Sequence, residues 1–149
     1  MPIHSIAISV TLDTGDPVVS EFLSDVITTA LAGGINYWAT VISYDPATAT
    51  AVLDDVEDDM GGHVARVAAT HLALDADVVA RGIKTVMEAR APFYDPNGTR
   101  SQCDDVPFLT AHWASVVRSA VLALDAGEID ADAADVIVQA ALFREVRYG

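Results

Sequence analysis

Two short turn sequences, at residues 45–48 and 60–62, constrain the fold of this chain most. They separate three segments typical of β-strands, at residues 35–44, 49–56 and 63–74. Connections this short predict antiparallel pairing, because a parallel crossover needs a dozen or more residues. An alternating, β-branched segment at residues 6–12 predicts one further strand. We therefore expect an antiparallel sheet of about four strands.

Four amphipathic segments predict helices that pack on this sheet. Good N-cap residues precede three of them, namely Asp16, Asp75 and Asp130. Pro17 follows Asp16 at the first helical position, which also favours a helix start. The first helix is expected to reach about Ala32, with Gly33 or Gly34 as a left-handed C-cap. Gly82 lies inside the second helix and indicates close packing there. The third spans about 106–126. The order of elements predicts one α+β domain covering residues 1–149.

The charge of the chain excludes several classes of partner. Its net charge is −14, with one Lys and seven Arg. Such a chain repels nucleic acid and disfavours anionic membranes, while it favours basic protein partners. The hydrophobic content of 52% is high for a small soluble protein. We expect a second copy to cover part of that apolar surface, which predicts a homo-oligomer.

No recognisable catalytic or metal-binding pattern appears in the sequence. The single Cys103 excludes an internal disulfide and a Cys-cluster zinc site. His63 and His71 share strand parity but lie too far apart to bind one metal ion. The N-terminus lacks a secretory signal, and no segment is long enough to span a bilayer. These patterns predict a cytoplasmic protein without a cofactor, a metal or an enzymatic activity.

Two adjacent aromatic residues, Tyr37 and Trp38, form the first candidate site. In a strand over residues 35–44 they point to opposite faces, so that one belongs to the core and the other is free. A free ring on a strand is a stacking surface for a base. The alternative is that both rings pack, one of them under a helix or a partner subunit.

The C-terminal segment provides a second candidate site. Arg144, Arg147 and Tyr148 place two guanidinium groups and a ring within the last six residues of an acidic chain. Guanidinium groups fit phosphate or carboxylate, so these residues suit an anionic ligand that carries a ring. The alternative is that both Arg residues complement the C-terminal dipole of the last helix and pair with nearby acids.

A long irregular segment at residues 90–105 is the third candidate. Arg90, Tyr94 and Arg100 in this segment suit a lid over a polar ligand. Its Pro and Gly residues suit a plain ordered loop equally well. The acidic cluster at residues 54–59 lacks the spacing of a calcium loop. That cluster suits a solvated strand edge, or an acidic face that imitates DNA phosphates.

Residues 33–38 and 135–149 resemble blocks in small uncharacterised proteins encoded by tailed phages of GC-rich hosts. The resemblance implies a phage accessory protein in the host cytoplasm that acts by stoichiometric binding. Together with the candidate residues, it predicts a non-enzymatic sponge for a small anionic, nucleotide-like ligand, with an anti-defence role. The alternative is an acidic protein–protein inhibitor, or DNA mimic, that acts on a host protein.

Overall fold

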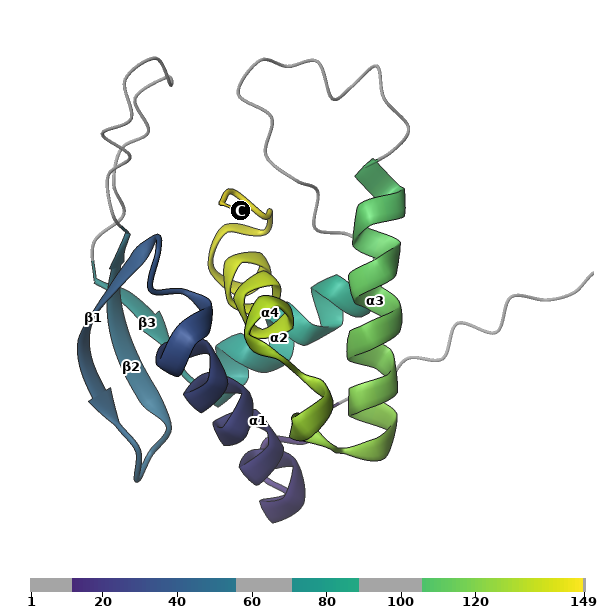
Figure 1. The fold of residues 1–149 in the computed structure, drawn as a ribbon. Helices are drawn as coiled ribbons and strands as arrows, with labels where there is room; N and C mark the ends of the chain where they lie inside the picture. Colours follow the sequence, from purple (N-terminus) through teal and green to yellow (C-terminus); the bar gives the residue numbers. More distant parts are fainter. Residues whose placement is uncertain (1–11, 56–70, 89–105, 149) are drawn as a thin grey trace, which may run out of the picture.

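The computed structural model describes residues 12–55, 71–88 and 106–148, which form an α+β fold (Figure 1). The elements follow in the order α1 (Pro17–Thr29), the π-helical turn η1 (Ala30–Gly34), β1 (Ala39–Asp45), β2 (Thr50–Asp55), β3 (Leu72–Leu74), α2 (Ala76–Met87), α3 (Val106–Ala123), the 3-10 turn η3 (Ala126–Glu128) and α4 (Ala131–Phe143). The described residues therefore contain four α-helices and three strands, which confirms the α+β class. The predicted strand at residues 6–12 lies outside the described residues, apart from Leu12.

The sheet is antiparallel throughout, in the order β1-β2-β3. β1 pairs with β2 from Ala39 opposite Asp55 to Asp45 opposite Thr50, with a bulge between Val41 and Ser43. β3 pairs with the other edge of β2. The predicted antiparallel pairing is thus confirmed for these strands. The described part of the predicted third strand is short, and residues 63–70 lie outside the described ranges.

Capping side chains begin three of the helices where the sequence predicts them. The carboxylates of Asp16, Asp75 and Asp130 each accept a hydrogen bond of 2.8 Å, from the backbone N–H of Val18, Val78 and Ala133 respectively. Each bond satisfies a backbone donor that has no partner within the helix, which stabilises a helix by about 1 kcal/mol. The predicted caps of α1, α2 and α4 are confirmed.

The two glycines after α1 act differently from the expectation. Neither Gly33 nor Gly34 has a positive φ, so the predicted left-handed C-cap is wrong. The chain continues instead into η1, where the Ile35 N–H donates to the Ala30 carbonyl at 3.1 Å. Gly34 is needed for close approach, because a Cβ there would lie 2.7 Å from the Ala131 carbonyl oxygen at the start of α4.

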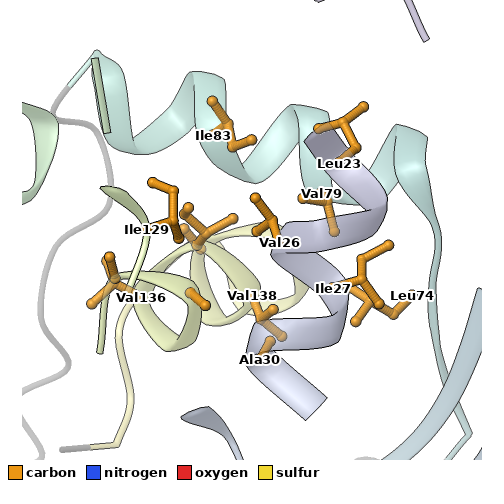
Figure 2. Packing of buried hydrophobic residues seen from close by; sticks show 14 of the residues in the cluster. Leu23, Val26, Ile27, Ala30, Leu74, Val79, Ile83, Ile129, Val136 and Val138 are labelled. Atoms are coloured by element: carbon orange, nitrogen blue, oxygen red, sulfur yellow. The ribbon is translucent and has the colours of Figure 1, made fainter. Parts of the chain in front are cut away.

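α4 lies in the middle of the molecule, with the sheet on one side and α3 on the other (Figure 1). Aliphatic side chains of α1, α2 and α4 meet in the core that Figure 2 shows, among them Leu23, Val26, Ile27, Val79, Ile83 and Val138. Gly82 of α2 faces α4, and a Cβ there would lie 2.7 Å from the Ala141 Cβ. The close packing predicted at Gly82 is confirmed. None of the described helices is long and apolar enough to cross a membrane.

Candidate functional site

α4 presents two different polar environments on opposite faces. At about 100° per residue, Asp135 and Gln139 share one face of the helix, and Ala141 and Arg144 lie on the other. Residues 133–140 are all buried, so both faces pack against other parts of the chain. The first face carries a hydrogen-bond network, and the second borders a hollow against α2.

The network on the first face is centred on the Asp135 carboxylate, which is 8% exposed. It accepts hydrogen bonds from the Tyr37 hydroxyl at 2.5 Å, from Trp38 Nε1 at 2.7 Å and from Gln139 Nε2 at 2.8 Å. Burial raises the pKa of Asp135, and the three donors oppose that rise by favouring the charged form. Burial and the adjacent carboxylate both raise the pKa of Tyr37, which keeps its phenol protonated as a donor.

The same network holds the C-terminal tail. Gln139 Oε1 accepts hydrogen bonds from the backbone N–H groups of Arg147 at 2.7 Å and Tyr148 at 2.8 Å. The Tyr148 ring stacks on Trp38 with 5.4 Å between centroids and 5° between planes. The Tyr148 hydroxyl donates to Asp55 Oδ1 at 2.6 Å. The tail thus connects α4 to the end of β2, while the buried Oδ2 of Asp55 has no hydrogen-bond partner among the described residues.

The two candidate rings near β1 have unequal exposure. Trp38 is 1% exposed and Tyr37 is 55% exposed, although the Tyr37 hydroxyl itself bonds Asp135. Both residues precede β1, however, in a turn where the Trp38 and Ala39 N–H groups donate to the Ile35 carbonyl. The predicted strand start at residue 35 is therefore wrong. Trp38 packs against Tyr148 and Phe143, and its buried ring leaves no face for a ligand.

The candidate Arg residues of the tail separate in space. Arg147 Nε donates to Glu145 Oε1 at 2.7 Å, and its guanidinium carbon lies 4.3 Å from the centroid of the Phe143 ring. These contacts match the alternative in which a tail Arg pairs with a nearby acid. Arg144 is exposed and lines the hollow beside α2. Three predicted lid residues, Arg90, Tyr94 and Arg100, lie outside the described residues.

The hollow on the second face of α4 has a volume of about 350 Å³. One wall comes from successive turns of α2 and the other from the end of α4; the lining residues are Arg81, Lys84, Thr85, Glu88, Ala140, Ala141 and Arg144. Spacings of three and four residues place the α2 side chains on one helical face. Its floor includes the small residues Ala140 and Ala141, whose short side chains leave room for a guest.

Positive charge dominates this hollow. Three of the five Lys and Arg residues in ranges 12–55, 71–88 and 106–148 line it, namely Arg81, Lys84 and Arg144. The Glu88 carboxylate contributes one negative charge. The C-terminal ends of α2 and α4 each contribute the equivalent of about half a negative charge. Among the described lining groups, about one positive charge remains in excess. A local positive field in an acidic molecule favours an anionic guest.

Sequence reasoning found Arg144 but missed the α2 residues Arg81, Lys84 and Thr85. The apolar positions of that segment predict burial and carry no information about its polar face. Two cations spaced by three residues beside the tightly packed Gly82 were the available signal. Their partner Arg144 lies about 60 residues further along the chain. Helix periodicity does not predict that residues so far apart in sequence lie close together in space.

Within the described ranges, no three His, Cys, Asp or Glu residues gather as a metal site. Asp54 of the acidic cluster accepts from the His71 N–H at 2.7 Å, and Asp55 bonds Tyr148, so both serve internal contacts. No family model matches this chain, and it matches neither a curated protein nor a solved structure.

Proposed function

We propose that the protein binds a small anionic ligand in the hollow between α2 and α4. The supporting observation is the convergence of Arg81, Lys84 and Arg144 on one space in a chain of net charge −14. Two guanidinium groups provide forked donors that match phosphate or carboxylate oxygens, and the Lys ammonium adds a point charge. In a chain with so few cations, their concentration at one place favours anion binding.

The size and walls of the hollow favour a compact anionic group. Its volume is near the lower end of the range of about 300–1,000 Å³ typical of ligand pockets. The lining side chains within residues 71–88 and 106–148 include no aromatic ring. Trp38 and Tyr148 lie with the Asp135 network on the other face of α4. For a nucleotide-like ligand, we therefore propose that the hollow takes the phosphate and that the base extends outward.

We propose sequestration without chemical turnover. The Thr85 hydroxyl donates to the Arg81 carbonyl at 2.9 Å, so its proton is directed at the helix backbone and not at a base in the hollow. This favours a binding role over nucleophilic catalysis. Sequestration also agrees with the stoichiometric binding that the resemblance to phage accessory proteins implies, and an anti-defence sponge would act in this way.

Thermal unfolding with a panel of anions tests the proposal. Inorganic phosphate, pyrophosphate and linear and cyclic nucleotides should raise the melting temperature, because they bind the folded state alone. At about 100 times the Kd, the stabilisation expected from mass action is about 2.7 kcal/mol. Binding should be strongest for the anions that place most charge in the hollow.

Two variants make the test specific. Arg81→Ala should remove most of the stabilisation, because it deletes a guanidinium that lines the hollow. Arg118→Gln removes the same charge from α3, where Arg118 donates to the Met87 carbonyl at 2.9 Å, and should keep the stabilisation. Equal loss in both variants would show that net charge, and not the hollow, determines the response.

A further inference from the structure

Arg144 occupies an unusual backbone conformation at the edge of the hollow. Its φ of 57° and ψ of 17° lie in the left-handed region at the end of α4. That region is unfavourable for residues other than glycine, because the Cβ crowds the following carbonyl. Contacts elsewhere in the chain must therefore hold the turn in place, and with it the residue that lines the hollow.

The contacts that hold the turn come from Gln139. This side chain is fully buried, and its Oε1 accepts from the N–H groups of Arg147 and Tyr148, three and four residues after Arg144. Its Nε2 donates to the Tyr148 carbonyl at 3.2 Å, so both ends of the amide bind the tail backbone. These bonds require the chain to reverse direction directly after α4.

The orientation of the Gln139 amide is itself fixed. Nε2 also donates to Asp135 Oδ1 at 2.8 Å and contacts the Tyr37 hydroxyl at 3.3 Å. Because Asp135 and the Tyr37 hydroxyl both lie beside Nε2, the amide oxygen Oε1 must face the N–H groups of the tail. Gln139 does not line the hollow and lies on the opposite face of α4. Any influence it has on the hollow must pass through the tail backbone and the turn at Arg144.

We propose that Gln139 is a positioning residue for the anion hollow. By binding the backbone at Arg147 and Tyr148, it fixes the left-handed turn that directs Arg144 toward Arg81 and Lys84. The inference rests on the proposed function, because it assigns a cause to the geometry of that same hollow. It predicts that the hollow is complete only when the tail is docked.

A double-mutant cycle with inorganic phosphate as the probe tests this inference. Gln139→Met keeps a similar length and removes the amide, while Arg144→Ala removes the guanidinium at the same backbone position. Each single variant should weaken phosphate binding by about tenfold, as expected for the loss of one charge-assisted contact. The double variant should bind no more weakly than Arg144→Ala, because both changes remove the same contact.

NMR backbone shifts of Arg144 provide a readout that needs no ligand. They should report the left-handed turn in the wild type and its loss in Gln139→Met. Should Gln139→Met fail to fold, a chain that ends at Glu145 removes the bound tail backbone and keeps Gln139. It should show the same tenfold loss of phosphate affinity.

The outcomes separate the two proposals. Absence of phosphate binding by the wild type would contradict the proposed function, and with it the positioning role. Normal binding by the wild type together with unchanged affinity in Gln139→Met and in the shortened chain would overturn the positioning role alone. Additive losses in the cycle would also overturn it, because Gln139 would then act on the hollow independently of Arg144.

Discussion

At the scale of single residues, Asp135 joins parts of the chain that lie far apart in sequence. Its carboxylate accepts from Tyr37 and Trp38, which precede it by 98 and 97 residues. Burial has the larger effect on its pKa, and the three donors only partly compensate. The carboxylate therefore connects the turn before β1 to α4 while it carries a charge that the folded state disfavours.

The raised pKa of Asp135 predicts a pH dependence of stability. Between its ordinary value of 3.8 and the raised value, the folded state binds more protons than the unfolded state. The free energy of unfolding that Asp135 contributes should therefore fall as pH rises through this window. Urea unfolding of the wild type and Asp135→Asn across acidic pH measures this difference. A difference that increases with pH would mean that the donors, and not burial, dominate.

The bond between Tyr148 and Asp55 should contribute to stability through desolvation. Tyr148→Phe deletes the hydroxyl that donates to the buried Asp55 carboxylate, whose other oxygen has no partner in the described part of the chain. We expect a loss of about 1–3 kcal/mol in the free energy of unfolding. Tyr44→Phe is the matched control, because it deletes an exposed hydroxyl that bonds Thr28, and it should cost less than about 0.5 kcal/mol. Equal costs would contradict the argument.

At the scale of elements, the packing of α2 on α4 determines where the hollow forms. Gly82 allows the two helices to approach closely, and the hollow opens beyond it toward their C-terminal ends, between Thr85 and Ala141. The contact fixes the separation of the two walls. A bulkier residue at position 82 would push the helices apart and would change the spacing between Arg81 and Arg144.

Gly82→Ala should therefore destabilise the protein, although Ala is the better helix former by about 1 kcal/mol. The added Cβ would meet α4, and such overpacking costs about 1–3 kcal/mol. Gly33→Ala is the matched control, because a Cβ there has nothing within 4 Å, and it should be neutral or slightly stabilising. Chemical denaturation of both variants checks the sign. A stabilised Gly82→Ala would contradict close packing.

Sequence reasoning succeeded for features that depend on neighbouring residues. The capping Asp residues, the antiparallel pairing and the tight packing at Gly82 follow from local patterns, and the structure confirms them. Sequence reasoning failed where contacts between residues far apart in the sequence determine the local structure. The turn at Tyr37 and Trp38 replaces a predicted strand because both side chains bond Asp135 on α4. The hollow likewise needs residues from two helices.

At the scale of the whole molecule, the acidic surface and the cationic hollow act in opposite directions on an anion. The net charge of −14 repels an approaching anion, and the local cations attract it at short range. Added salt screens the long-range repulsion, because the Debye length is about 10 Å at about 0.1 M. It also weakens the attraction between the anion and those cations of the hollow that are exposed to solvent.

The homo-oligomer expected from composition stays a prediction.

Arg81→Ala and Glu88→Gln should therefore change anion affinity in opposite directions. Arg81→Ala removes a positive charge from the hollow and should weaken phosphate binding, while Glu88→Gln removes a negative charge and should strengthen it. Isothermal titration at low and high ionic strength measures both effects, which should shrink as salt is added. Changes of the same sign in the two variants would show that the local charge balance does not control affinity.

NMR titration of the wild type with inorganic phosphate tests the central claim most directly. The amide signals of Thr85, Ala140, Ala141 and Arg144 should shift with saturation, because these residues line the hollow. Signals of Tyr37 and Trp38 on the other face of α4 should stay near their starting positions. Shifts centred on Tyr37 and Trp38, or no saturable shift at all, would contradict an anion site between α2 and α4.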